Sequence, residues 1–105
     1  ICDKTRSWLA ATAADKFRIA SGEEALTRYR FTADGQAEPR ITHHFCATCG
    51  VRTHAQGTGP GGAPMVMVQV ASLDDADREL LAGKIVYVDG LHDRFDREPV
   101  HKGAL

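Results

Sequence analysis

Two cysteines separated by two residues are the part of this sequence with the clearest chemistry. Cys46 and Cys49 belong to the run Cys-Ala-Thr-Cys-Gly, which ends at Gly50. Two thiolates at this spacing can bind one zinc ion at about 2.3 Å each, and a following glycine tolerates the positive φ that turns backbone amides towards the sulfurs. The spacing predicts a zinc knuckle on a turn between two strands.

Two other interpretations of this cysteine pair remain open. A redox dithiol of the thioredoxin kind has its cysteines at the start of a helix inside a β-α-β unit, whereas residues 50–54 have no helical pattern. Two inert thiols in a core are the third interpretation. Of the three, the sequence favours zinc.

A structural zinc site takes four protein ligands, and the knuckle provides two of them. Cys2 offers one more sulfur. Three histidines are near the knuckle in sequence, namely His43, His44 and His54. Strands direct alternate side chains to opposite faces, so these three cannot all point the same way. A site of three cysteines and one histidine is geometrically possible. We favour a second pair of ligands upstream of Ile1, because the sequence begins without a methionine.

Other candidate residues carry weaker signals. Lys4 and Arg6 could lower the pKa of the Cys2 thiol or bind a ligand carboxylate, although exposed basic side chains are usually only solvated. Trp8 is expected in the core. The carboxylates at 74–75 and 89–93 lack a spacing for general acid–base chemistry, so we expect them to cap helices and form turns.

Length and composition limit the class of protein. The 105 residues, 43% of them hydrophobic and 26% charged, suit a single domain over residues 1–105. A net charge of −1 with both signs interspersed argues against nucleic acid and acidic lipid as partners. No apolar run approaches the roughly 20 residues that cross a bilayer, and no leader is recognisable. We therefore expect a cytoplasmic protein whose three cysteines are reduced rather than paired in disulfides.

Hydrophobic patterns predict the strands that position the knuckle. Strands are expected at 26–31, 41–45, 51–55 and 84–88, and short strands are plausible at 8–14 and 17–20. Met65 to Ala71 is the longest β-branched apolar run and is expected to be the central strand, with Val68 and Val70 buried. Gly57 to Pro64 is expected to be a loop. A short helix should follow the acidic residues at 74–75 and end at Gly83.

Taken together, several segments resemble the family of glutathione-dependent formaldehyde-activating enzymes. They are Ile1-Cys2 with Trp8, Phe17, Ser21-Gly22-Glu23, Tyr29 and Phe31, 44–50, Gly57-Thr58-Gly59, 70–75 and 89–93. The most specific element is Phe-Cys-x-x-Cys-Gly at 45–50, and the resemblance covers almost the whole chain. It implies a mainly β fold of the β-tent type, with small zinc-binding antiparallel sheets and one short helix.

The same resemblance implies two zinc sites. In the family, an N-terminal Cys-x-Cys completes a structural site whose other half corresponds to Cys46 and Cys49. A separate Cys-x-Cys-x-x-Cys holds the catalytic zinc, and its last cysteine corresponds to Cys2. The resemblance therefore implies that the other ligands lie upstream of Ile1 and that Cys2 lies apart from the knuckle.

The implied activity is that of a zinc-dependent carbon-sulfur lyase of the S-(hydroxymethyl)glutathione synthase type, or of a related thiol-adduct enzyme. Its partners would be a small-molecule thiol such as glutathione and an aldehyde. Cys2 would be the catalytic residue, and Lys4, Arg6 or Arg52 would orient the glutathione carboxylates. The alternative is a non-catalytic zinc-stapled binding module that contacts a partner through the Gly57 to Pro64 loop. The sequence predicts no oligomeric state.

Overall fold

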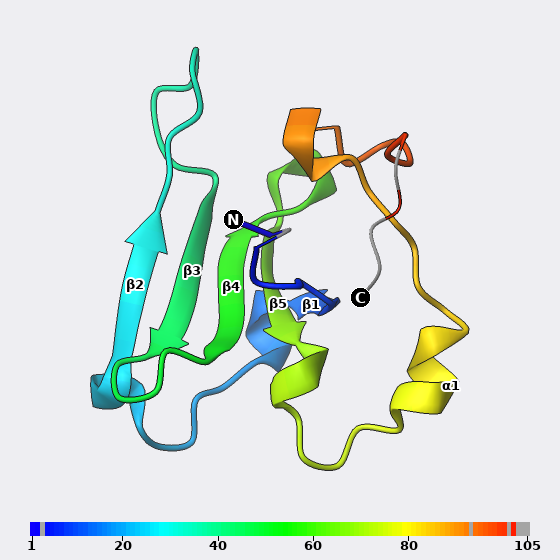
Figure 1. The fold of residues 1–105 in the computed structure, drawn as a ribbon. Helices are drawn as coiled ribbons and strands as arrows, with labels where there is room; N and C mark the ends of the chain where they lie inside the picture. The colour runs from blue at the N-terminus through cyan, green and yellow to red at the C-terminus, as the bar shows by residue number, and fades with distance from the viewer. Residues whose placement is uncertain (3, 93, 101, 103–105) are drawn as a thin grey trace. The chain divides into compact units, whose positions relative to one another are not determined.

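The computed structural model describes residues 1–2, 4–92, 94–100 and 102. The chain contains two compact units, Trp8–Asp74 and the combination of Ile1–Ser7 with Asp75–Leu105. The larger unit, Trp8–Asp74, contains the β-sheet (Figure 1). Within the described part of the chain, no helix is long and apolar enough to cross a membrane.

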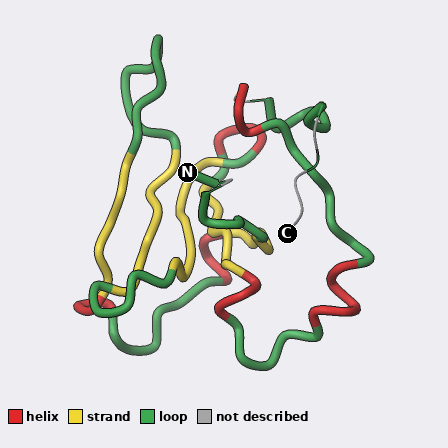
Figure 2. The backbone as a smooth tube through the Cα atoms, viewed as in Figure 1, coloured by secondary structure: helices red, strands yellow, loops and turns green. Residues whose placement is uncertain are grey.

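Antiparallel strands dominate the larger unit. In sheet order, the strands of the described chain are β1 (Leu9–Ala13), β5 (Pro64–Gln69), β4 (Arg52–Thr58), β3 (Ile41–Cys46) and β2 (Leu26–Arg30). Figure 2 shows them in yellow, and each neighbouring pair is antiparallel. The prediction of a mainly β fold with one short helix is confirmed.

The hairpin of β3 and β4 carries the knuckle at its turn. His44 pairs with His54 and Phe45 pairs with Arg52, so Thr53 is the extra residue of a β-bulge. Such a bulge bends the strand and increases its twist. On the other side of β3, Leu26 pairs with Cys46. The start of β2 therefore lies at the same end of the sheet as the turn between β3 and β4 (Figure 1).

The apolar run from Met65 to Ala71 is neither central nor a strand throughout, so that prediction is wrong in two respects. The middle strand is β4, and β5 ends at Gln69. Residues Val70–Ser72 form a 3₁₀ turn instead, which the Ser72 hydroxyl stabilises by donating to the Gln69 carbonyl at 2.8 Å. Val70 is buried as expected, whereas Val68 is half-buried.

Two predicted strands are absent from the described chain. Residues 84–88 and 17–20 have no strand pairing, and Val86 is 80% exposed, because an apolar pattern forms a strand only where a partner strand is available. The loop expected at 57–64 is shorter than predicted, since β4 runs to Thr58 and β5 begins at Pro64. Trp8, expected in the core, is half-buried.

The predicted helix is α1 (Arg78–Ala82), in the smaller unit. Asp77 caps it, because its carboxylate accepts the backbone N–H of Leu80 at 2.9 Å, and Gly83 follows its last residue. The remaining 3₁₀ turns are Ala14–Lys16, Glu23–Ala25, Pro60–Gly62 and Gly90–His92.

Truncation of a buried valine should destabilise the fold, whereas truncation of an exposed one should not. Val66 is 2% exposed and Val86 is 80% exposed. Val66→Ala should lower the free energy of unfolding by about 1–3 kcal/mol, because it loses buried methyl groups and leaves a cavity. Val86→Ala should change it by less than about 0.5 kcal/mol. Urea denaturation followed by Trp8 fluorescence measures both, and equal losses would contradict the burial described here.

Candidate metal centre

The turn between β3 and β4 brings the two knuckle cysteines together. The backbone N–H of Cys46 donates to the Val51 carbonyl at 2.8 Å, and that of Gly50 donates to the Cys46 carbonyl at 2.9 Å. Gly50 has a φ of 74°, which a residue with a Cβ adopts only with strain. This turn joins Cys46, at the end of β3, to Cys49 and the start of β4.

Backbone amides favour the thiolate form of Cys46. Hydrogen bonds from the N–H groups of Cys49 and then Thr48 lower the pKa of the Cys46 thiol. The thiolate is the form that binds metal. Cys46 is half-buried and Cys49 is exposed, so a metal ion can approach both sulfurs from solvent.

These two residues fit half of a tetrahedral zinc site. Within the described residues, no three His, Cys, Asp or Glu side chains form a group that could hold a metal ion. The alternative site of three cysteines and one histidine includes Cys2, which belongs to the smaller unit, so it stays a prediction. Cys2 is exposed and belongs to the smaller unit, so its assignment to a separate zinc stays a prediction.

Two histidines stack across the hairpin, on the same face of the sheet as Leu26. The rings of His44 and His54 have centroids 4.2 Å apart and planes inclined by 6°, and only 3% and 4% of these residues are exposed. Arg28 Nε donates to His44 Nε2 at 3.4 Å. Phe17 lies over His54 with ring centroids 5.0 Å apart.

The sequence did not predict this stacked pair, because each histidine was expected only as a single candidate ligand. Pairing of His44 with His54 depends on the register and on the bulge at Thr53. The expected hairpin over 41–45 and 51–55 suggested that they lie near each other, but not that they share a face.

Burial keeps the imidazoles neutral at pH 7. It lowers the pKa of His54 to about 4 and, together with Arg52, that of His43 to about 4. Burial and the Arg28 guanidinium also lower the pKa of His44. Two neutral rings can stack closely, whereas two imidazolium ions would repel each other.

A cavity of about 230 Å³ opens beside this pair, at the end of the sheet that carries the knuckle. It is lined by Phe17, Ile19, Ser21, Gly22, Leu26, Thr53 and His54. Leu26 is the register partner of Cys46, so the cavity and the knuckle are neighbours on one edge of β3.

The expected glutathione-orienting residues differ in exposure. Arg52 is only 5% exposed, so it does not present its guanidinium to solvent as that role requires. Lys4 and Arg6 are exposed and belong to the smaller unit with Cys2. Their role stays a prediction.

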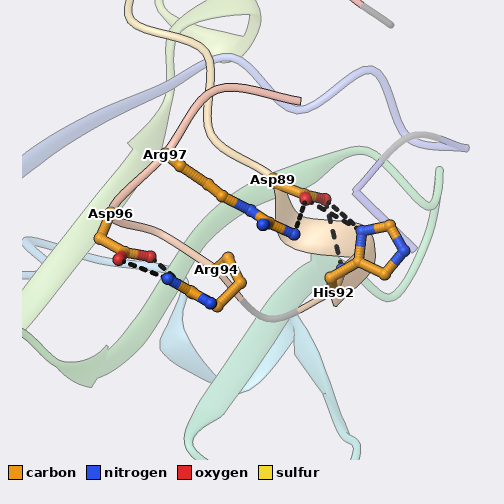
Figure 3. Close-up of polar contacts among 5 residues, drawn as sticks. All are labelled: Asp89, His92, Arg94, Asp96 and Arg97. Carbon is orange, nitrogen blue, oxygen red and sulfur yellow. Dashed lines mark hydrogen bonds and ion pairs between the residues drawn. The ribbon is translucent and has the colours of Figure 1, made fainter. Parts of the chain in front are cut away.

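A buried carboxylate organises a turn in the smaller unit (Figure 3). Asp89 is 4% exposed, and its oxygens accept from His92 Nδ1 at 2.9 and 3.0 Å and from Arg97 Nη2 at 3.0 Å. Hydrogen bonds from His92 and Arg97 lower the pKa of Asp89. Arg94 donates its backbone N–H to the Asp89 carbonyl at 2.9 Å and forms a two-bond ion pair with Asp96. Asp89 therefore has the turn role expected from the sequence.

The comparisons with known proteins give one informative likeness. No family model matches the sequence, and no curated protein matches it. The crystal structure of a Rhodobacter sphaeroides protein is similar, with a TM-score of 0.60 and 30% sequence identity. The likeness covers 75% of this chain and 67% of that chain. It supports the fold described above.

Acid should destabilise the protein before its carboxylates are protonated. The unfolded chain binds protons at His43 and His54 near pH 6.5, whereas the folded chain does so only near pH 4, so stability falls as the pH is lowered through this range. Urea midpoints between pH 7.5 and 4 measure the slope. His54→Gln should reduce this slope, because it removes one of the two imidazoles. A flat profile would contradict the neutral burial of these rings.

Loss of the Asp89 charge should loosen its turn. Asp89→Asn removes charged acceptors from His92 and Arg97, so the amide of Arg94 should exchange with solvent about tenfold faster or more. Asp96→Asn is the control, because its ion pair with Arg94 lies at the surface. Hydrogen exchange followed by NMR measures both variants, and equal acceleration would contradict the organising role of Asp89.

Proposed function

This chain belongs to the family of the Rhodobacter sphaeroides protein, and from that premise we propose that it is a zinc protein whose Cys46 and Cys49 form half of a structural tetrathiolate site. The observation that carries the proposal is the tight turn that contains the two cysteines, in which the Gly50 N–H donates to the Cys46 carbonyl at 2.9 Å and the Cys46 N–H donates to the Val51 carbonyl at 2.8 Å. The backbone amides of Cys49 and Thr48 also lower the pKa of the Cys46 thiol, which favours the thiolate that binds metal.

The position of the knuckle supports zinc over a redox dithiol. Cys46 ends a strand, and the chain returns into β4 after the turn. A thioredoxin-like pair is activated by the N-terminus of a helix, and no helix of the described chain begins at these cysteines. A metal ion bound here would hold the two ends of the hairpin turn together.

We propose that the activity is that of a carbon-sulfur lyase of the S-(hydroxymethyl)glutathione synthase type, or of a related thiol-adduct enzyme. In this reaction the glutathione sulfur bonds to the formaldehyde carbon, the C=O bond becomes single and the thiol proton ends on the oxygen, and the reverse reaction breaks the C–S bond. Zinc, when bound, supplies a Lewis acid for the thiolate or the aldehyde. The resemblance of the sequence to the formaldehyde-activating enzymes supports this proposal.

Cys2 is the residue to which we assign the catalytic ligand role. Its exposure leaves the sulfur open to a metal and a small thiol, and the neighbouring Lys4 is an exposed cation that can bind a glutathione carboxylate. The cytoplasm is the compartment we propose, because reduced thiols are needed for both roles.

A second candidate is a zinc-stapled binding module without catalytic activity. The observation that favours it is the exposed connection between β4 and β5, where residues 60–64 are all exposed and Gly61 and Gly62 have positive φ. Such a connection can present backbone groups to a protein partner.

Zinc binding tests the structural part of the proposal. In the zinc-loaded protein, Cys46→Ser should remove one zinc ion per chain and lower the melting temperature, because the metal contributes to folding. Ala47→Ser is the matched control, since it adds a hydroxyl in the same turn and removes no ligand. Metal analysis with cobalt substitution, read from thiolate-to-cobalt absorption, measures the loss. Unchanged zinc content in Cys46→Ser would refute the knuckle as a metal site.

The enzyme and the module differ in their zinc content and in the effect of Cys2. Two zinc ions per chain favour the enzyme, and one favours the module. Cys2→Ser should abolish condensation of glutathione with formaldehyde, followed by NMR, and leave the melting temperature nearly unchanged. Full turnover in Cys2→Ser would exclude its catalytic role.

A further inference from the structure

The strand β2 forms one edge of the sheet (Figure 1). Within the described chain its only strand neighbour is β3, and every residue of β2 after Leu26 is exposed. An exposed edge strand presents backbone groups that can pair with an extended segment of another molecule.

The register with β3 shows which backbone groups of β2 face outward. The Ala47 N–H donates to the Ala25 carbonyl at 2.8 Å, so these two residues form a hydrogen-bonded pair one step before the first register pair of β2. In an antiparallel ladder such pairs alternate with pairs whose N–H and C=O groups point away from each other. Leu26, Arg28 and Arg30 belong to the second kind, and their N–H and C=O groups therefore point to the outer edge.

The side chains of β2 alternate between two chemistries. Arg28 and Arg30 lie on one face of the strand, and Thr27 and Tyr29 lie on the other. Tyr29 is 43% exposed, and Phe31, directly after the strand, is 63% exposed. Arginines alone would protect an edge from pairing, whereas exposed aromatic rings beside them are typical of a surface that binds a partner.

The arginine face of β2 already attracts a carboxylate. Arg28 Nη2 lies 3.8 Å from Glu23 Oε1, and the two side chains are 56% and 67% exposed. An ion pair this exposed contributes little to stability, so the carboxylate of a bound partner can replace that of Glu23. Arg30 is also exposed, two residues further along the same face. The face is therefore complementary to acidic side chains at a spacing of two residues.

We propose that β2 binds an extended peptide in which acidic residues alternate with aromatic or β-branched ones, and that this peptide adds an antiparallel strand to the sheet. Its acidic side chains lie opposite Arg28 and Arg30, because cross-strand pairs of opposite charge stabilise neighbouring strands. Its apolar side chains lie opposite Thr27 and Tyr29. Backbone hydrogen bonds to the outward groups of β2 supply affinity that does not depend on sequence.

Self-pairing and nucleic acid fit this edge less well. Antiparallel pairing of the whole of β2 with β2 of a second copy places Arg28 opposite Arg28, and like charges directly opposite each other destabilise a sheet. Phosphate oxygens can accept from the arginines and from the outward N–H groups, but they cannot donate to the outward carbonyls. An acidic peptide strand satisfies both the charges and the carbonyls.

Synthetic peptides test this chemistry. The probe is Glu-Val-Glu-Phe-Glu-Val-Glu with blocked ends, and the control peptide has Lys at every Glu position. In titrations followed by NMR, the acidic peptide should shift the amides of residues 26–31 and slow hydrogen exchange of the Leu26, Arg28 and Arg30 amides at least about tenfold at saturation. The Lys peptide should bind at least about tenfold more weakly. No binding of the acidic peptide, equal binding of both, or shifts centred on another element would overturn the proposal.

Backbone methylation distinguishes strand addition from attraction between charges alone. In the proposed register each Glu of the probe directs its N–H to β2, and each Val directs its N–H away. N-methylation of the two inner Glu residues should weaken binding at least about tenfold, and N-methylation of the two Val residues less than about threefold. Equal losses would show that the peptide does not pair as a strand and would overturn the proposal.

Two charge reversals of equal size locate the binding site. Arg30→Glu places a like charge opposite the acidic side chains of the probe, whereas Arg18→Glu changes the net charge equally at an exposed position outside β2. Arg30→Glu should weaken binding of the acidic peptide about fivefold or more, and Arg18→Glu less than about twofold. Equal effects would overturn the location. If Arg30→Glu does not fold, the methylated peptides on the unaltered chain decide.

Two further titrations test the other occupants. If a deoxythymidine decamer shifts the amides of β2 and the acidic peptide does not, the edge binds nucleic acid. If these amides shift as the concentration of the protein alone is raised, the edge pairs with a second copy. Either result would overturn the proposal.

Discussion

The pairing of β3 with β4 is the constraint on which the candidate site depends. Its turn carries Cys46 and Cys49, and its register brings His44 opposite His54. The bulge at Thr53 supplies the hydroxyl that orients the His54 ring. A shift of one residue in this register would send every side chain of β4 to the other face and would separate all these groups.

The small apolar core explains why a metal suits this architecture. Among the described residues, the fully buried apolar side chains are Ala55, Val66 and Val70, and polar residues such as His44 and His54 occupy the neighbouring buried positions. Domains of this size bury little surface and are commonly stabilised by a metal or a disulfide. Buried imidazoles add a dependence on pH, since they must stay neutral. In the smaller unit, the buried Asp89 carboxylate instead accepts hydrogen bonds from His92 and Arg97.

One end of the sheet combines two different chemistries. The knuckle offers two sulfur atoms that a metal ion can approach from solvent, whereas the adjoining cavity offers mainly apolar walls. Leu26, which lines the cavity, pairs with Cys46 of the knuckle in the strand register. The position of this turn therefore also determines the position of Leu26 in the cavity wall.

The sequence by itself determined the features that depend on local spacing. Cys-x-x-Cys-Gly predicted the knuckle turn, alternation predicted β2 and β3, and the acidic residues at 74–75 followed by Gly83 predicted the short helix α1. Only the tertiary structure decided that β4 is the middle strand, that residues 84–88 form no strand, and that His44 stacks on His54. A local pattern orients side chains within a segment, but strand order, register and bulges depend on hydrogen bonds between residues far apart in sequence, and single-segment patterns carry no information about those partners.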